Sequence, residues 1–102
     1  MYNLLPQMIQ ARRMDPEFQK VGPNSAKSDK GFTVTWRPSG GVDYSDANGT
    51  IRVDSEMLVK PSRILVYPRS GGLKTMTDGH AEEVLGDVMR ALEYLGHQVE
   101  RW

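Results

Sequence analysis

The sequence of 102 residues contains no cysteine. Without thiols the chain forms neither a disulfide framework nor a thiolate zinc site. It has no apolar run near the roughly 18 residues that a membrane-spanning helix requires. It also lacks an excess of charge, because 13 Lys and Arg balance 13 Asp and Glu. This balance argues against a protein that binds DNA or anionic lipid by bulk attraction. We therefore expect one cytoplasmic domain without membrane partners.

The N-terminal part of the chain has a different composition from the rest. Apolar residues recur at helical spacing within residues 3–14, and Asp15-Pro16 then stops that pattern. Residues 19–31 contain Gly, Pro, Asn, Ser and three lysines but few apolar side chains. We therefore predict that residues 1–31 form a short helix and a flexible linker, and that the folded domain spans residues 32–102.

Short strands are indicated from Phe32 onward. Apolar and polar residues alternate over residues 32–37 and again over residues 51–53, as half-buried strands require. Asn48-Gly49 is typical of a tight hairpin turn. Ser62 to Tyr67 is apolar on both faces, which predicts a central or covered strand. Val99 to Trp102 can add a short edge strand or pack back over the sheet.

One long amphipathic helix is indicated near the C-terminus. Thr77 or Asp78 can cap its start, and Gly96 is placed to end it in the left-handed conformation. Its apolar stripe consists of Val84, Leu85, Val88, Ala91, Leu92 and Leu95. The fold class expected is α+β: an antiparallel four- to five-stranded meander covered by one long C-terminal helix, with a short N-terminal helix.

The sequence offers little reaction chemistry. His80 and His97 fall at opposite ends of the predicted helix, about 20 Å apart at 1.5 Å per residue, so one site does not use both. Ser39-Gly40-Gly41 and Ser70-Gly71-Gly72 match no phosphate-binding loop and are typical of turns. We therefore expect no catalytic residues, no metal site and no cofactor.

Carboxylates cluster in the middle of the chain. Asp43 and Asp46 fall on one predicted strand, and Asp54 and Glu56 on its predicted hairpin partner. Asp43 and Asp54 share the solvent-facing parity, which is typical of polar residues on an open sheet face. The alternative is that the same cluster forms an acidic patch that receives a basic partner. An enzyme would instead require a pocket that holds His80 or the Asp43 and Asp54 pair.

A nucleic-acid-binding module is the alternative. Threonines and Tyr67 accompany outward-facing arginines on the predicted sheet, and such a surface can stack single-stranded nucleic acid. No ribonucleoprotein motif is present, and the carboxylates would oppose phosphate. These arginines are Arg37, Arg52, Arg63 and Arg69.

Several segments together resemble a known family. Val42 to Asp46, Ile51 to Leu58, Ile64 to Tyr67 and Val84 to Glu100 are similar to the immunity proteins of bacterial polymorphic-toxin and contact-dependent growth inhibition systems, specifically immunity protein 74. In that family an S-E-x-L strand precedes an apolar strand ending in Tyr, and the last helix ends in Gly before a V-E segment. Family members tend to carry a Trp after the Tyr-ended strand, whereas Leu73 to Met76 supply none.

The resemblance implies a small cytoplasmic protein that binds and neutralises the C-terminal toxin domain of a cognate secreted toxin. Such an interface would bury roughly 1,200–2,000 Å² and depend on charged rim residues and aromatic anchors. Tyr44 shares the apolar parity of Trp36, which favours a core position for it. The candidate partner-binding residues are Asp43, Tyr44, Asp46, Arg52, Asp54, Glu56, Tyr67 and Trp102.

Overall fold

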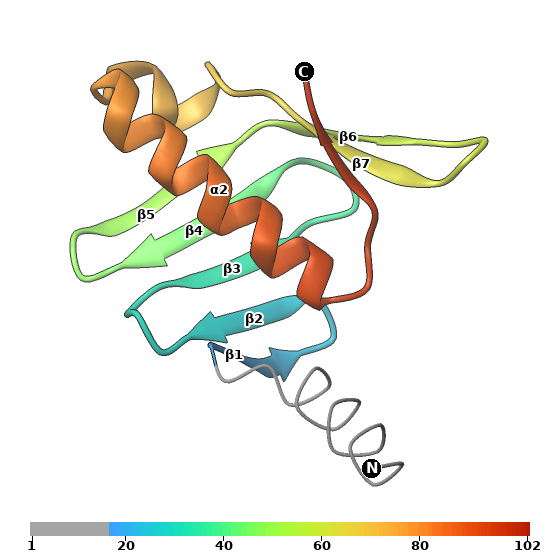
Figure 1. Cartoon of the computed structure of the whole chain (residues 1–102), viewed down its shortest axis with the longest axis horizontal. Coiled ribbons are helices and arrows are strands. Elements are labelled where there is room, and N and C mark those ends of the chain that lie inside the picture. The colour runs from blue at the N-terminus through green and yellow to red at the C-terminus, as the bar shows by residue number, and fades with distance from the viewer. Residues whose placement is uncertain (1–16) are drawn as a thin grey trace, which may run out of the picture.

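The computed structural model describes residues 17–102, so the predicted N-terminal helix lies outside the described residues. The first sheet is an antiparallel meander of β1 (Phe18–Gly22), β2 (Ser25–Ser28), β3 (Thr33–Trp36), β4 (Val42–Asp46) and β5 (Gly49–Val53). The second sheet contains β6 (Ser55–Leu58), β7 (Arg63–Val66) and β8 (Val99–Arg101), and the helices are η1 (Gly71–Thr75) and α2 (Asp78–Tyr94). Helix α2 lies across one face of the first sheet (Figure 1). The predicted α+β class is confirmed.

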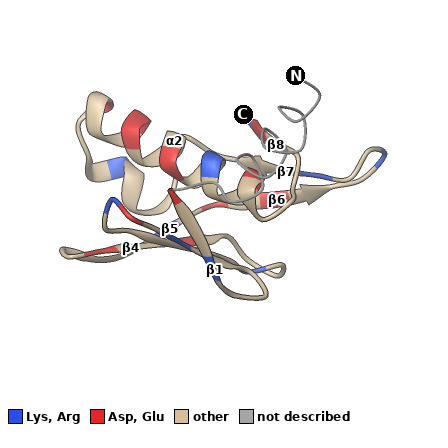
Figure 2. Ribbon diagram, turned by 60° about the horizontal axis from the view of Figure 1, so that its bottom comes forward, with Lys and Arg blue, Asp and Glu red and all other residues tan. Residues whose placement is uncertain are grey.

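The core lies between α2 and the inner faces of the two sheets. On β3 and β4, Val34 pairs with Tyr44 across the strands, and both side chains are buried. Figure 2 shows the helix as a layer on one side of the first sheet. The predicted apolar stripe faces this sheet: Val84, Leu85, Val88, Ala91 and Leu92 are buried, and Leu95 packs partly buried against them. Burial of these aliphatic side chains is the main favourable term that holds the layers together.

Both ends of α2 have the predicted caps. The Thr77 hydroxyl accepts a hydrogen bond from the backbone N–H of His80 at 3.3 Å. Gly96 adopts φ +101°, which lets the N–H of His97 donate to the carbonyl of Leu92 at 3.1 Å. The capping groups thus satisfy helix-end donors and acceptors that have no partner within the helix.

The prediction of a flexible linker over residues 19–31 was wrong. These residues include β1 and β2, so the sheet starts at Phe18 rather than at residue 32. Phe18 is buried, with its ring 6.1 Å from that of Phe32 and 5.4 Å from that of Tyr94. On β2 the buried side chains are only Ala26 and Ser28. Such small or polar inner residues produce no visible apolar alternation, which is why the hairpin resembles a linker.

The predicted meander also breaks after β5. Asp54 separates β5 from β6, which pairs with β7 in the second sheet. As predicted, β7 is central and the C-terminal segment forms an edge strand; β8 runs parallel to β7. Glu56 therefore lies in a different sheet from Asp43, and its predicted place on the hairpin partner of that strand was wrong. The residue opposite Asp43 is Arg52 on β5.

The Ser70-Gly71-Gly72 turn joins the two sheets. The buried hydroxyl of Ser70 donates to the carbonyl of Tyr67 at 2.6 Å and accepts from the N–H of Asp54 at 2.9 Å. Gly71 has φ +53°, and a Cβ at this position would overlap the backbone carbonyl of Arg52. Only glycine allows the turn to approach β5 so closely.

Replacing Gly71 with alanine is expected to lower the free energy of unfolding by about 2–4 kcal/mol, because the new Cβ collides with backbone and the φ is strained. Gly79→Ala is the matched control, since Gly79 lies in α2 with open space around it. There alanine should stabilise by up to about 1 kcal/mol. Urea unfolding compares the two, and equal midpoints would contradict the close approach.

His97 packs under the end of the helix. Its ring lies 4.5 Å from that of Trp36, at an interplanar angle of 61°. Burial lowers the pKa of His97 below its ordinary value, since the imidazolium loses water there.

We expect stability to fall as the pH drops through about 6.5, because the unfolded chain takes up the His97 proton before the folded chain does. The loss levels off below the lower pKa of the folded state. Urea unfolding between about pH 5 and 8 measures this dependence. His97→Gln should remove the part of the pH dependence that His97 causes, while His80 remains. If the free energy of unfolding of that variant depends on pH as in the wild type, His97 is not the group responsible.

Candidate partner-binding surface

The second sheet has an outer face that points away from the core. Ile64 and Val66 on β7 point inward and are fully buried. Side chains of opposite parity therefore point outward, because successive residues of a strand alternate between faces. Glu56 and Glu100 pair with Leu65 across the strands, so each of the three strands contributes a side chain to this side. We call the following set the outer face: Glu56, Arg63, Leu65, Tyr67, Glu100 and Trp102.

Two aromatic residues stand out on the outer face. The Trp102 side chain is 78% exposed, and its ring lies 6.5 Å from that of Tyr67. The backbone N–H of Trp102 donates to the carbonyl of Val66, which holds the residue against β7. The Tyr67 hydroxyl donates to the Glu56 carboxylate at 2.6 Å. This hydrogen bond raises the pKa of Tyr67 and orients its ring.

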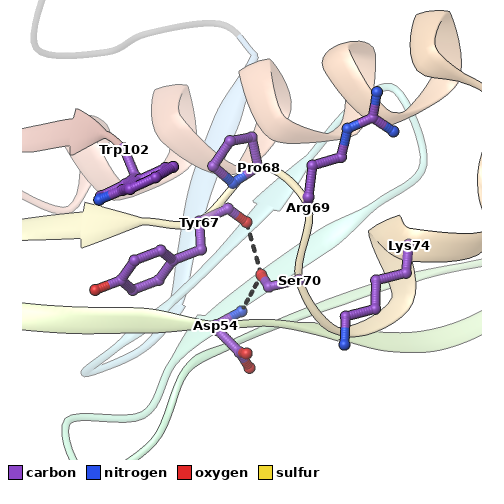
Figure 3. Close-up of a pocket in the computed structure, with 7 residues that line it drawn as sticks. All are labelled: Asp54, Tyr67, Pro68, Arg69, Ser70, Lys74 and Trp102. Atoms are coloured by element: carbon purple, nitrogen blue, oxygen red, sulfur yellow. Dashed lines mark hydrogen bonds between the residues drawn. The ribbon is translucent and has the colours of Figure 1, made fainter.

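A cleft of about 430 Å³ lies beside these rings. Figure 3 shows the rings of Trp102 and Tyr67 on one side of the cleft and the side chains of Arg69 and Lys74 on the other. Its lining residues are Asp54, Tyr67, Pro68, Arg69, Ser70, Lys74 and Trp102. The cleft thus combines an aromatic wall with a cationic one, and three predicted site residues meet in it.

Arg69 and Lys74 differ in their partners. Arg69 donates to Asp78 at 2.5 Å, and both side chains are largely exposed. Within residues 17–102, Lys74 has no ion-pair or hydrogen-bond partner on its side chain. The cationic wall therefore presents an ammonium group that is available to an external anion.

Asp43 lies on the open face of the first sheet and is enclosed by arginines. Arg37 donates to one of its oxygens at 2.5 Å and Arg52 to the other at 2.7 Å, while Arg52 also reaches the carbonyl of Gly40. Burial alone would raise the pKa of Asp43, but these two hydrogen bonds outweigh it and lower the pKa. The predicted acidic patch is thus neutralised at Asp43.

The other two predicted site residues have local structural partners. Tyr44 is 8% exposed, stacks on Phe32 at 5.2 Å and donates its hydroxyl to Asp87 at 3.3 Å. Burial and then the Asp87 charge raise the pKa of Tyr44 to about 12. Asp46 accepts from the N–H of Asn48 at 2.8 Å and so supports the β4–β5 turn.

The eight predicted residues therefore do not form one site. Asp54, Tyr67 and Trp102 line the cleft, and Glu56 is joined to it through the Tyr67 hydroxyl. Asp43 and Arg52 meet on the first sheet instead, and Tyr44 and Asp46 have the separate surroundings described above.

Most of the cleft opposite the aromatic rings was not predicted from the sequence. Arg69 was predicted only as part of a nucleic-acid surface, and no binding role was predicted for Lys74, Pro68 or Ser70. Their common signal is position, because all of them fall within eight residues of the end of β7. This position alone does not predict a binding site. It does so only once Trp102 is known to lie beside the same turn.

Chemistry at His80 has little structural support. His80 is exposed in the first turn of α2 and lines a depression of about 110 Å³ with Tyr44 and Asp46. Within residues 17–102, no three His, Asp or Glu side chains gather closely enough to hold a metal ion. None of the helices in this part of the chain has the length and apolar character needed to cross a membrane.

Asp43→Asn is expected to lower the free energy of unfolding by about 1–2 kcal/mol at pH 7, because charge-assisted hydrogen bonds from two guanidinium groups are weakened. Asp29→Asn is the control, since Asp29 is exposed. The difference in free energy of unfolding between the wild type and Asp43→Asn should shrink as the pH falls below about 4. There the Asp43 carboxylate becomes protonated first in the unfolded and then in the folded state. Urea unfolding at neutral and acidic pH measures this, and equal stabilities at pH 7 would contradict it.

Comparisons with known proteins identified no relative of this chain. No family model, no curated protein and no solved structure matches the chain. The function of the outer face is therefore inferred from its own residues and geometry.

Proposed function

We propose that this chain is an immunity protein that binds and neutralises the C-terminal toxin domain of a cognate secreted toxin in the bacterial cytoplasm. The observation that carries the proposal is the aromatic pair of half-buried Tyr67 and exposed Trp102, which lies beside a cleft with a cationic wall. Trp, Tyr and Arg are the residues that most often dominate the energy of protein–protein interfaces. A surface that concentrates them is well suited to a tight protein partner.

The positions of the family-like segments support the same proposal. The S-E-x-L element forms β6, the Tyr-ended strand is β7, and the V-E segment opens β8. These three strands are the second sheet, so the segments that carry the resemblance supply Glu56, Leu65, Tyr67 and Glu100 of its outer face, while Arg63 and Trp102 lie just outside those segments. The loop in which family members tend to have a Trp here contributes Lys74 to the cleft, and the tryptophan in the cleft is Trp102.

Neutralisation would follow from steric occlusion. The β6–β7 hairpin projects beyond the body of the domain in both views (Figures 1 and 2). Val59 is exposed in its turn, and Met57 is exposed on the side opposite the outer face, since Met57 pairs with Ile64. A projecting hairpin with exposed apolar residues can enter a concave surface, while Trp102 and the cleft anchor the interface. Arg63 and Glu100, which pair at 3.1 Å, lie where charged rim residues would discriminate between toxins.

The nucleic-acid alternative is less well supported by the geometry. Arg37 and Arg52 both donate to Asp43 on the open face of the first sheet, so their charges are partly neutralised before any phosphate arrives. A nucleic-acid surface gains affinity from cations that are free to replace counterions. We therefore place the partner surface on the second sheet.

The test is co-expression with the C-terminal domain encoded by the gene immediately upstream. Cells that produce that domain should survive only when this chain is present, and the two purified proteins should form a complex. Trp102→Ala should weaken the complex by about 30-fold or more, the loss typical of an aromatic hot spot. Val21→Ala is the matched control, because Val21 is also exposed but lies on β1 of the first sheet. Calorimetry measures both affinities.

Two outcomes would contradict the proposal. One is growth that does not depend on this chain while an active toxin domain is produced. The other is the absence of a complex with the domain, together with salt-dependent binding of single-stranded DNA or RNA that Arg52→Ala abolishes.

A further inference from the structure

The aromatic wall of the cleft is suited to an apolar side chain. Trp102, Tyr67 and Pro68 line it, and the two aromatic rings are tilted by 36° to each other. The volume of about 430 Å³ is that of a small ligand site and can hold one large side chain with its backbone. Burial of such a side chain against two aromatic rings would supply the hydrophobic part of the binding energy.

The opposite wall is suited to a carboxylate. Two cations and one carboxylate, Asp54, line the cleft, which leaves a lining charge of +1. Lys74 has no side-chain partner within residues 17–102. Among residues 17–102, the ion-pair partner of Arg69 is Asp78, and exposures of 62% and 81% make this pair weak and easily exchanged. An incoming anion would therefore meet one available ammonium group and one guanidinium that can change partners.

The two walls are held at a fixed separation. The Ser70 hydroxyl ties the Tyr67 carbonyl to the Asp54 amide, and Gly71 sits directly against the backbone of Arg52. Trp102 is tied to β7 by its own backbone hydrogen bond. A cleft that is rigid before binding loses little entropy when it is filled.

We propose that this cleft is the anchor pocket for a segment of the toxin domain in which a large apolar side chain lies next to an acidic one. The inference rests on the proposed function and names the chemistry of the partner. The apolar side chain packs against Trp102 and Tyr67, and the neighbouring carboxylate pairs with Lys74 and Arg69. A basic segment would be repelled by the same two cations.

The test uses two capped peptides as probes, N-acetylated and C-amidated Glu-Phe-Glu and Lys-Phe-Lys. Amide chemical shifts of the full, ¹⁵N-labelled chain are followed during titration to millimolar peptide. The acidic peptide should shift the amides of Arg69, Ser70, Lys74 and Trp102, and the basic peptide should not. Lys74→Glu should weaken the acidic peptide at least about tenfold and make the basic peptide the better ligand.

Lys27→Glu is the matched control, because it makes the same charge change on the exposed side of β2. It should leave both titrations unchanged, and the dispersion of the spectra reports whether each variant is folded. The proposal is overturned if neither peptide shifts the cleft amides, or if both shift them equally. It is also overturned if oligothymidylate shifts these amides and the acidic peptide does not.

Titration with the toxin domain separates this inference from the proposed function. If the wild-type chain binds the domain and neither Lys74→Glu nor Trp102→Ala weakens the complex, the anchor pocket is wrong and the immunity function stands. If the wild-type chain does not bind the domain, the proposed function is wrong, and the peptide titration still decides which side chains the cleft prefers.

Discussion

The bridge made by Ser70 is the contact on which the arrangement of the two sheets depends. The Ser70 hydroxyl donates to the carbonyl of Tyr67, the residue after β7, and accepts from the amide of Asp54, which separates β5 from β6. Gly71 adds a close backbone contact with Arg52 that no other residue permits. Because a buried hydroxyl with two partners is costly to disturb, this junction sets where the second sheet, its outer face and its cleft lie.

Helix α2 packs on β2, β3 and β8 and so leaves each sheet with one uncovered side. The two uncovered sides have different chemistry. On the first sheet, Arg37 and Arg52 share the Asp43 carboxylate, so their charges are partly neutralised, and the Ser45 and Thr50 hydroxyls are hydrogen-bonded to each other. These polar groups of the surface thus already have partners within the protein. On the second sheet, aromatic rings and an available ammonium group remain exposed, so this side has more to gain from a partner.

Sequence patterns predicted the elements whose signals are local. The apolar stripe, the Thr77 cap and the left-handed Gly96 were all predictable, because each depends on residues within one helix. The hairpin of β1 and β2 was not, since its buried positions are Ala26 and Ser28. Nor was the break at Asp54, because the residues on either side continue the same alternation and the partner that causes the break, Ser70, is 16 residues away.

The sequence by itself determined the fold class, the capped helix and the strands whose large apolar residues alternate, since these depend on nearest-neighbour geometry and the burial of one face. Tyr67 and Trp102 were also among the partner-binding candidates predicted from the sequence. Only the tertiary structure decided that the two rings meet, because the parallel pairing of β8 with β7 brings Trp102 back beside a strand that ended 36 residues earlier. That pairing brings Trp102 to the cleft that Lys74 also lines. Helix α2 leads into β8 and packs on strands of both sheets, and so brings the C-terminal segment to this place.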